Sequence, residues 1–354
     1  MENNTTEPIK LTQFSKGAGC GCKIAPNVLQ EILHTTTVYN SPNLLVGNGN
    51  NDDAAVYDLG DGNAIISTTD FFMPIVDDAF AFGQIASANA ISDVYAMGGK
   101  PLMAVAILGW PLQKLSTAAA QQVLEGARNI CAAAGIPLAG GHSIESEEPI
   151  FGLSVNGMVA INHLKQNNAA QIGDVLLLTK PIGVGILSTA QKRGVISAED
   201  ESTMMQQLIV LNAIGQELSA IAGVHAMTDV TGFGLLGHLI EMCEASSCAA
   251  NLFYNHVPKL ECALPYLAQR IVPDATYRNW NSYNAKTGFG TGVNVMEAFN
   301  LLPDPQTNGG LLLSVAPDSI QEVQQLFKER GIPFTTPIGQ MVTMQGKVVM
   351  VQMS

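Results

Sequence analysis

Residues 54–69, AAVYDL-GDGN-AIISTT, decide how the first half of this chain folds. Two apolar runs, 54–59 and 64–69, flank a turn of glycine, aspartate and asparagine, which is the pattern of an antiparallel hairpin. The pairing would bring Asp53, just before the first strand, next to Asp70, just after the second. Two carboxylates that close repel each other, so the hairpin predicts something cationic between them.

Strands and helices alternate along the rest of the chain, and this order predicts an α/β (α+β) fold in two domains. In the first half we expect helices at 82–97 and 116–134 and strands at 101–109, 136–139 and 149–161. A polar linker at 163–170 precedes the second half. There we expect strands at 174–179, 225–228, 311–315, 337–342 and 347–352. We expect helices that begin after 183–185, over 198–222 with breaks, and at 318–330, and one that the stretch 229–238 opens and that ends near 245.

The composition is that of a globular chain with an excess of acid. Hydrophobic residues make up 47% and charged residues 13%, so a large core can be buried. The 30 acidic and 17 basic residues give a formal net charge of −13, which argues against nucleic acid as a partner. No apolar run is long enough to span a membrane, and the cysteines match no secreted disulfide framework. We therefore expect a reduced, cytoplasmic protein.

Four aspartates stand beside small residues at the ends of predicted elements: Asp53, Asp70, Asp93 and Asp229. Carboxylates without histidine or cysteine partners suit Mg²⁺ or Mn²⁺ rather than zinc, and magnesium is usually shared with the phosphates of a substrate. Each aspartate alone is better explained as a helix cap or a turn residue. Together they favour a magnesium-dependent site for a phosphorylated ligand.

Two glycine-rich stretches are candidates for binding phosphate. Residues 232–237 match the G-x-G-x-x-G dinucleotide fingerprint, but no acidic residue lies near 257 to bind a ribose, and Asp229 stands where a pyrophosphate would come. Residues 140–143, Gly-Gly-His-Ser, are expected to form a loop whose N–H groups contact phosphate or ribose. His142 is either structural or polarises a substrate. The other histidines, His238 among them, are expected to be structural.

Residues 17–23, GAGCGCK, place two thiols and one amine in a glycine-rich stretch. Glycine gives the backbone unusual freedom, so we expect a mobile loop in which neither thiol has a bulky neighbour in sequence. Lys23 is expected either to lower the pKa of the Cys20 thiol or to reach an anionic substrate. The plain alternative is a flexible tail with incidental cysteines. With the aspartates, the stretch suggests a loop that closes over a site for phosphoryl chemistry.

Seven stretches, in unbroken order along nearly the whole chain, resemble the selenophosphate synthetase (selenide, water dikinase) family: 17–23 (GAGCGCK), 51–56 (NDDAAV), 67–72 (STTDFF), 89–93 (NAISD), 96–101 (AMGGKP), 140–143 (GGHS) and 228–234 (TDVTGFG). The aspartate and Gly-Gly-His-Ser motifs are shared with a wider ATP-binding superfamily that includes aminoimidazole ribonucleotide synthetase. The cysteine–lysine stretch carries the narrower resemblance. It implies synthesis of selenophosphate from ATP, selenide and water, with release of AMP and orthophosphate, for selenocysteine and selenouridine biosynthesis.

The resemblance also implies roles for the matching residues. Cys20 would be the selenium-handling nucleophile, and Lys23 would be catalytic and contact the ATP phosphates. Several Mg²⁺ ions would be held with ATP by Asp53, Asp93 and Asp229. The nucleotide would also be contacted by Asn50, Asn51, Asp52, Asp70, Asp93, Gly141, His142 and Ser143. Asn308, where we expect serine in relatives, departs from the family but is expected to lie away from the ATP motifs.

In architecture, the resemblance implies the two-domain aminoimidazole ribonucleotide synthetase-like fold. We expect a flexible segment over 1–47, an ATP- and Mg-binding dimerisation domain over 48–163, and a C-terminal α/β domain over 170–354. The N-terminal domains would pair into a β-barrel in a homodimer, close to the bound ATP. Expected partners are ATP, selenide and a selenide-delivery protein, and neither nucleic acid nor a membrane.

Three other functions stay open at this point. A sister ATP enzyme of the same fold would act on another small substrate and would not need Cys20. A nucleotide-binding scaffold, or a selenium or metal carrier, would bind ATP without turnover. A NAD-dependent oxidoreductase would rest on residues 232–237 alone.

Overall fold

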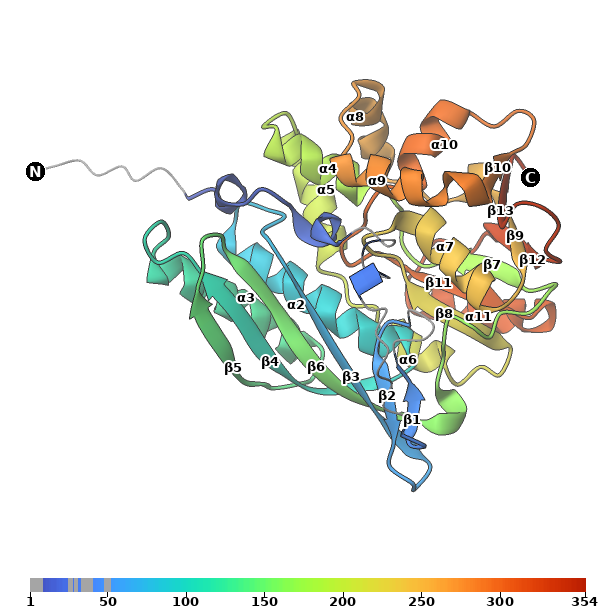
Figure 1. Cartoon of the computed structure of the whole chain (residues 1–354), viewed down its shortest axis with the longest axis horizontal. Helices are drawn as coiled ribbons and strands as arrows, with labels where there is room; N and C mark the ends of the chain where they lie inside the picture. Colours follow the sequence, from blue (N-terminus) through green and yellow to red (C-terminus); the bar gives the residue numbers. More distant parts are fainter. Residues whose placement is uncertain (1–8, 25–27, 29–30, 33–40, 48–51) are drawn as a thin grey trace, which may run out of the picture.

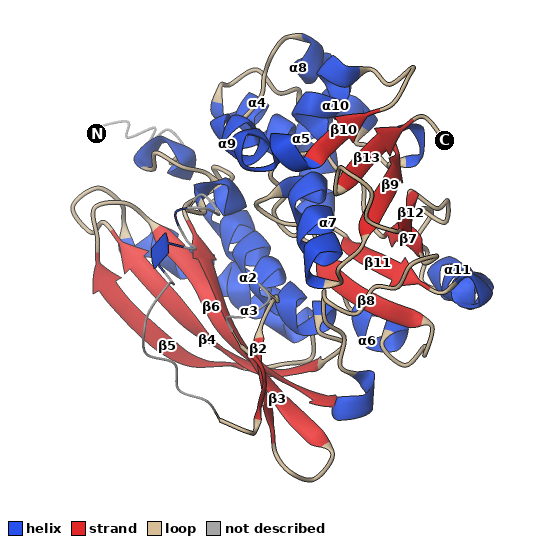
Figure 2. Ribbon diagram, turned by 45° about the vertical axis from the view of Figure 1, so that its right-hand side comes forward, coloured by secondary structure: helices blue, strands red, loops and turns tan. Residues whose placement is uncertain are grey.

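The structure is a computed structural model of the chain, and it describes residues 9–24, 28, 31–32, 41–47 and 52–354. Two units, each built on one β-sheet, lie side by side (Figures 1 and 2). Asn50 and Asn51, two of the expected ATP contacts, lie outside the described residues. A search of the described helices finds none that is both long and apolar enough to cross a membrane.

The first unit is a six-stranded sheet in the order β1-β2-β3-β6-β4-β5. Its strands are β1 (Leu44–Val46), β2 (Ala55–Asp58), β3 (Asn63–Phe72), β4 (Lys100–Trp110), β5 (Leu138–Glu145) and β6 (Ile150–Ala160). The predicted hairpin is confirmed, because β2 and β3 pair antiparallel with Ala55 opposite Ser67. Strand β6 pairs antiparallel with both β3 and β4, and β5 pairs parallel with β4 at the edge.

Helices α2 (Ala79–Ala96) and α3 (Thr117–Ala133) cover one face of this sheet (Figure 2). The two helices touch closely, since a Cβ atom on Gly83 of α2 would lie only 1.9 Å from the carbonyl oxygen of Val123 in α3. The apolar stripe expected over 82–97 is buried, but so are polar residues of α2 such as Asn89. The reason is that α2 packs on the first sheet and also against strand β8 of the second unit.

The second unit is a seven-stranded sheet in the order β10-β13-β9-β12-β7-β11-β8. Its strands are β7 (Val175–Leu178), β8 (Val224–Asp229), β9 (Ala249–Phe253), β10 (Thr287–Phe289), β11 (Leu311–Val315), β12 (Gly339–Val342) and β13 (Val349–Gln352). Its helices are α4 (Val184–Lys192), α5 (Ala198–Leu208), α6 (Ile214–Leu218), α7 (Gly234–Ala245), α8 (Leu264–Ala268), α9 (Asp274–Tyr283), α10 (Val295–Leu301) and α11 (Ile320–Glu329).

Short 3₁₀ turns complete the described elements: η1 (Leu11–Phe14), η2 (Gly19–Cys22), η3 (Ile161–His163), η4 (Tyr254–His256), η5 (Glu261–Ala263), η6 (Asn284–Lys286) and η7 (Pro317–Ser319). Of these, η1 and η2 belong to the N-terminal segment. That segment lies where the two units meet, beside α4 and α5 (Figure 1).

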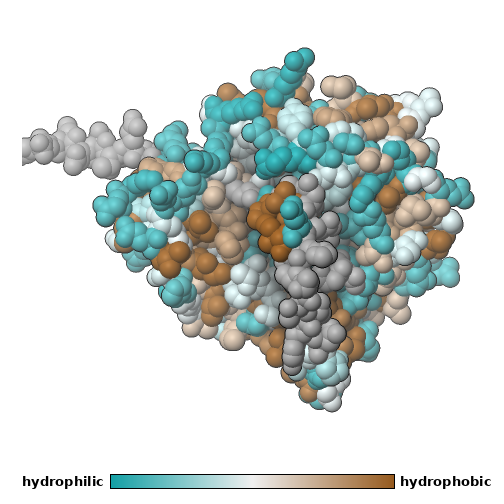
Figure 3. All heavy atoms as spheres, viewed as in Figure 1, coloured by the Kyte–Doolittle hydropathy of each residue, from teal (hydrophilic) through white to brown (hydrophobic). Residues whose placement is uncertain are grey.

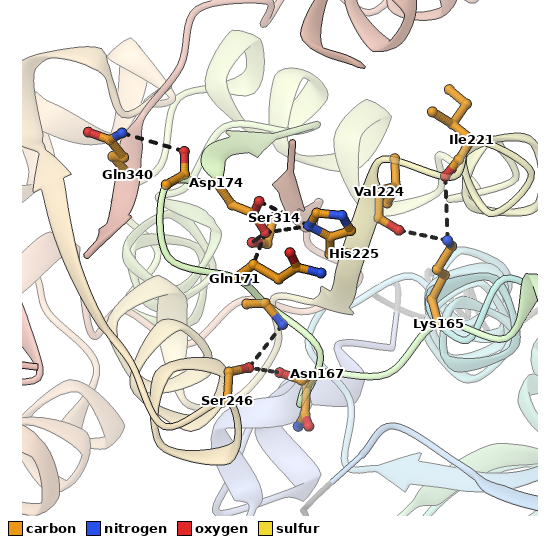
Figure 4. A network of polar contacts seen from close by, with 12 residues as sticks. Lys165, Asn167, Gln171, Asp174, Ile221, Val224, His225, Ser246, Ser314 and Gln340 are labelled. Carbon is orange, nitrogen blue, oxygen red and sulfur yellow. Dashed lines mark hydrogen bonds and ion pairs between the residues drawn. The ribbon is translucent and has the colours of Figure 1, made fainter. Parts of the chain in front are cut away.

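Polar contacts hold the connection between the two units (Figure 4). The ammonium of Lys165 donates to the carbonyl oxygen of Val224 at 2.6 Å, at the start of β8. Further along, the buried carboxylate of Asp174 accepts from Ser314 Oγ at 2.7 Å and pairs with His225. The connection therefore positions the beginning of β8, whose other end carries Asp229.

One prediction about local structure is wrong. Residues 140–143 do not form a loop after a strand at 136–139 but lie inside β5, with His142 opposite Ile107 of β4. The pattern was hard to see because β5 is an edge strand, exposed along almost its whole length. Without a core on either face, its sequence need not alternate between apolar and polar residues.

Candidate active site

The four predicted aspartates converge from separate elements: Asp53 before β2, Asp70 in β3, Asp93 in α2 and Asp229 at the end of β8. Hydrogen bonds join these elements around the carboxylates. Thr228 Oγ1 donates to Asp53 Oδ1 at 3.0 Å, and Ser92 Oγ donates to Asp229. The end of β8 is thus tied to both the hairpin and α2.

The electrostatics of this cluster call for a cation. Burial raises the pKa of Asp53, Asp93 and Asp229, and the charge of Asp229 raises the pKa of the other two further. The Oδ2 atom of Asp53 is buried and finds no hydrogen-bond partner among the described residues. A divalent cation would replace the repulsion by attraction, and oxygen donors of this kind match Mg²⁺.

The cluster is not a closed metal site. Within the described ranges, no three His, Cys, Asp or Glu side chains form a group that could hold a metal ion. Magnesium commonly takes one or two carboxylates and completes its coordination with water and substrate phosphates. The aspartates therefore fit a metal that is shared with a phosphate ligand.

Cys20 lies in η2 and is only 1% exposed. Its thiol donates to Asn89 Oδ1 at 3.2 Å, and its backbone N–H donates to Thr307 Oγ1 at 3.0 Å. Burial and the charge of Asp70 raise the pKa of the thiol, and Lys23 does not offset them. Lys23 lowers the pKa of the thiol, as one of the two expected roles requires, but the net direction is upward, and in this conformation tertiary contacts cover the thiol and hold it neutral.

Asn89 connects Cys20 with the aspartates, and sequence reasoning gave it no role of its own. Its Oδ1 atom accepts from the thiol and also from the Asn308 N–H at 2.7 Å, while its Nδ2 atom donates to Asp70 at 2.5 Å. These partners define the orientation of the amide. The available signal was its spacing of four residues from Asp93, which puts both on one face of α2.

Residues 304–310 also belong to the site, so the expectation that Asn308 lies away from the ATP motifs is wrong. Asn308 is fully buried with φ +47°, and its carbonyl oxygen accepts from Lys180 Nζ at 2.9 Å. Burial lowers the pKa of Lys180 to about 7. The loop arrives here because β11 pairs with β8 and places Leu311 opposite Asp229, a pairing that no local motif announces.

Lys23 brings a positive charge to the same place. Its Nζ atom lies 3.5 Å from Thr231 Oγ1 and 5.9 Å from the centre of the Phe233 ring. Removal of the ammonium from water lowers the pKa of Lys23, but Asp70 and the neighbouring acidic groups raise it, and the net direction is upward. The Lys23 side chain is exposed as a whole, yet its charged end faces the carboxylates.

Gly232, the first residue of the stretch 232–237, makes room for the N-terminal segment. A Cβ atom on Gly232 would lie 2.7 Å from the carbonyl oxygen of Cys20. The preceding Thr231 N–H donates to His238 Nε2 at 3.1 Å. Burial, assisted by Lys23, lowers the pKa of His238 to about 3, so the ring is neutral and can accept. His238 therefore has the structural role that was expected, and it holds the loop that carries Thr231.

Gly141, His142 and Ser143 do not meet the aspartates within one chain. Strands β6 and β4 separate β5 from β3, and three strand spacings amount to about 14 Å. The register also places His142 on the face of the sheet that carries Phe71, and consecutive residues of a strand point to opposite faces, so Asp70 faces the other way. Asp52 does lie beside Asp53, and its Oδ1 atom accepts from the Asn167 N–H at 2.8 Å.

Comparison with known proteins defines the class first. A family model named "AIR synthase related protein, N-terminal domain" matches residues 51–159, and the corresponding C-terminal domain matches 171–352. The thiamine-monophosphate kinase structure from Stenotrophomonas maltophilia K279a is similar, with a TM-score of 0.63 and 21% identity over 88% of this chain and 92% of that one. Hydrogenase maturation protein HypE in complex with ATP has a TM-score of 0.63 and 17% identity over 88% of this chain and 87% of that one. The fold is that of the AIR synthase related proteins.

Full-length relatives narrow the class to one family. Selenide, water dikinase of Aeromonas salmonicida (strain A449) is 52% identical over 339 residues, which cover 96% of this chain and 97% of that protein. Selenide, water dikinase of Yersinia pseudotuberculosis serotype I (strain IP32953) is 52% identical over 345 residues, covering 97% and 98%. The chain belongs to the selenide, water dikinase family.

Proposed function

We propose that this chain catalyses the ATP-dependent formation of selenophosphate from selenide, and that the site around Cys20 and the four aspartates performs the reaction. The observation that carries the proposal is that the segment 17–23 lies directly on the aspartate cluster, with Cys20 bonded to Asn89 of α2 and to Thr307 before β11. The name and the full-length match of the curated relatives support the same activity.

Some residues of the site would neutralise charge, and others would position the reacting groups. Asp53, Asp93 and Asp229 would hold Mg²⁺ with the ATP phosphates, and the bound metal would neutralise charge that develops during phosphoryl transfer. Lys23 stays cationic, which supports the proposal that it would contact phosphate oxygens. Cys20 keeps its proton while it donates to Asn89, so this segment must shift before the sulfur can act on selenium.

The net reaction converts ATP, selenide and water into selenophosphate, AMP and orthophosphate. One phosphorus–selenium bond and one phosphorus–oxygen bond to water form, while both phosphoanhydride bonds of ATP break. Water must reach one phosphoryl group and not the other. The N-terminal segment covers the site in this structure, with Cys20 only 1% exposed, and such a cover can exclude water until it opens.

The test is ³¹P NMR of the full-length chain with ATP, Mg²⁺ and selenide under anaerobic, reducing conditions. We expect a phosphorus signal coupled to selenium that grows in step with AMP and orthophosphate. The control omits selenide and should show no AMP. If ATP stays intact, or if ADP accumulates whether or not selenide is present, the proposal fails.

We also propose that two copies pair through the uncovered face of the first sheet. Large apolar side chains gather there, and Figure 3 shows hydrophobic residues over this sheet. Members of this set, with their exposed fractions, are Ile65 (38%), Phe71 (51%), Met103 (43%), Ile144 (61%) and Met158 (39%). A sheet face that exposes several large apolar side chains in this way usually marks an interface. His142 lies on the same face, so pairing would place residues 140–143 beside the partner copy.

Sedimentation velocity tests the pairing. Phe71→Glu together with Ile144→Glu should convert a dimer into a monomer and weaken ATP binding by about tenfold or more. Ile172→Glu is the matched control, since Ile172 is 60% exposed but lies after the connection, away from this sheet. A double variant that sediments like the unmodified chain would overturn the pairing. The cytoplasmic location and a selenide-delivery protein stay predictions.

A further inference from the structure

Lys192, in the last turn of α4, contacts the N-terminal segment and not the aspartate cluster. Its ammonium donates to three consecutive carbonyl oxygens of the N-terminal segment: Ser15 at 3.0 Å, Lys16 at 3.1 Å and Gly17 at 3.1 Å. A lysine ammonium has three N–H donors, and here every one of them has a backbone acceptor. Such a match holds a stretch of backbone rather than a single residue.

The residues that Lys192 contacts lie directly before Cys20 in the chain. Cys20 follows Gly17 by three residues, and between them Gly19 takes φ +51° and donates its N–H to the carbonyl of Met73 at 3.1 Å. A shift of the backbone at 15–17 would therefore be passed on to the thiol. Helix α4 belongs to the second unit, so Lys192 ties the segment to the side of the site that carries Asp229.

A second cation holds the other flank of Cys20. Arg278 in α9 donates from Nη2 to the carbonyl oxygen of Gly21 at 2.9 Å. Neither Lys192 nor Arg278 forms an ion pair with a carboxylate within the described part of the chain. In a chain with net charge −13, two cations that face backbone carbonyls instead of acids are well placed to bind a segment that must also be released.

We propose that Lys192 is a positioning residue for the reaction, which holds the carbonyls of residues 15–17 and thereby sets Cys20 against Asn89 and the aspartate cluster. The proposal rests on the role of Cys20 given above. Contacts of an ammonium with carbonyl oxygens at a wet surface exchange readily with water, so the segment can open for substrate and close again. Lys192 itself touches neither the thiol nor the aspartates; it acts through the backbone.

The first test measures the segment without the reaction. In Lys192→Met, trypsin should cut the Lys16–Gly17 bond about five to ten times faster, because the carbonyl of that bond loses its donor. Alkylation of Cys20 by iodoacetamide, followed by peptide mass spectrometry, should rise by a similar factor because the thiol becomes accessible. The matched control is Arg193→Met, which removes the same charge one residue later. In the described structure the Arg193 side chain has no hydrogen bond or ion pair.

The second test measures turnover. Lys192→Met should lower kcat for selenide-dependent AMP formation by about tenfold, while KM for ATP stays within about twofold, because positioning of the thiol and not ATP binding is impaired. Lys192→Arg keeps a donor at this place and should recover most of kcat. Arg193→Met should behave like the unmodified chain in every assay.

The outcomes separate this inference from the proposed function. Wild-type rates of cleavage and alkylation in Lys192→Met would overturn the inference, and so would faster cleavage with unchanged kcat. Failure of Lys192→Arg to recover activity would also count against it. A fully active Cys20→Ser variant would instead refute the role of Cys20, whatever Lys192 does to the segment.

Discussion

The two halves of the candidate site are held in place by different forces. Asp70, Asp93 and Asp229 belong to β3, α2 and β8, and Asp53 directly precedes β2; apolar residues of all four elements are buried in the hydrophobic clusters. The Cys20 segment is held mainly by hydrogen bonds of its backbone: its carbonyl oxygens accept from Lys192 and Arg278, and the Cys20 N–H donates to Thr307. Its described apolar anchors are few, chiefly Leu11 and Cys20 itself, both almost fully buried.

The difference shows how a site can be both preorganised and accessible. Carboxylates that repel one another stay together only if a rigid framework holds them, and Lys23 is a cation that the described residues bring to this cluster. The thiol has the opposite requirement, because a substrate must pass it. A segment held by exchangeable polar contacts can leave and return at little cost in buried apolar area. The following variants test this division, from the largest expected effect to the smallest.

Cys20→Ser should have the largest effect. We expect selenophosphate formation to fall roughly a thousandfold or more, because a serine hydroxyl is a far poorer nucleophile, while the thermal unfolding midpoint stays nearly unchanged. The measurement is AMP release with selenide, beside a thermal melt. Cys262→Ser, at a partly exposed cysteine in η5, is the control and should be fully active. A fully active Cys20→Ser protein would refute the role of the Cys20 thiol as the nucleophile.

Asp229→Asn tests the rigid half. We expect kcat to fall about a hundredfold, because one carboxylate for the metal is lost. The free protein should be no less stable than the unmodified chain. Burial raises the pKa of Asp229, so ionisation of this group as pH rises works against folding, and the amide removes that cost.

Thermal melts with and without Mg²⁺ and ATP measure this effect. The unmodified chain should gain stability from the ligands, and Asp229→Asn should gain little. Asp61→Asn, in the exposed turn of the hairpin, should respond like the unmodified chain. An undiminished gain in Asp229→Asn would remove Asp229 from the metal site.

Two glycines in the Cys20 segment provide a sharper contrast. A Cβ atom on Gly19, which has φ +51°, would lie 2.5 Å from Thr307 Oγ1, whereas a Cβ atom on Gly21 would meet its nearest neighbour at 3.6 Å. Gly19→Ala should therefore displace the thiol and lower kcat by about tenfold, and Gly21→Ala should change kcat by less than about twofold. Steady-state kinetics of both variants decide the matter. Equal losses would mean that flexibility, and not the placement of Cys20, limits the rate.

His238→Leu should have the smallest effect on rate and a clear dependence on pH. Its loss leaves the Thr231 N–H without an acceptor and should cost about 1–3 kcal/mol of unfolding free energy at pH 7. The pKa of His238 lies near 3 when folded, below its usual value of 6.5, so the unfolded chain takes up a proton first as pH falls. The unmodified chain thus loses stability below about pH 6.5, a loss the variant lacks.

Urea unfolding at pH 7 and pH 5 measures this prediction. The stability gap between the two proteins should narrow by about 1–2 kcal/mol at the lower pH. His256→Leu is a useful comparison, because His256 contacts the carbonyl of Pro337, far from the site loop. A gap that widens toward pH 5 would show that the ring is protonated in the folded protein.

Several features were predictable because they are local. The hairpin at 54–69 is written in two β-prone runs around a turn, and strand β11 appears at Leu311–Val315 where its apolar run stands. The role of Asn308 was not predictable from its neighbours. It reaches Asn89 through the pairing of β11 with β8, and a contact 219 positions apart along the chain leaves no local pattern.

By itself, the sequence determined the family and which side chains carry chemistry, since thiol, ammonium and carboxylate groups are fixed by residue type and their motifs stand in order along the chain. Only the tertiary structure decided the protonation state of these groups and which residues lie next to them. Burial turned Cys20 into a neutral thiol bonded to Asn89, and strand register turned His142 away from Asp70. The physical reason is that the pKa of a group and the direction in which a side chain points depend on residues distant in sequence. Only the packing of the folded chain brings these residues together.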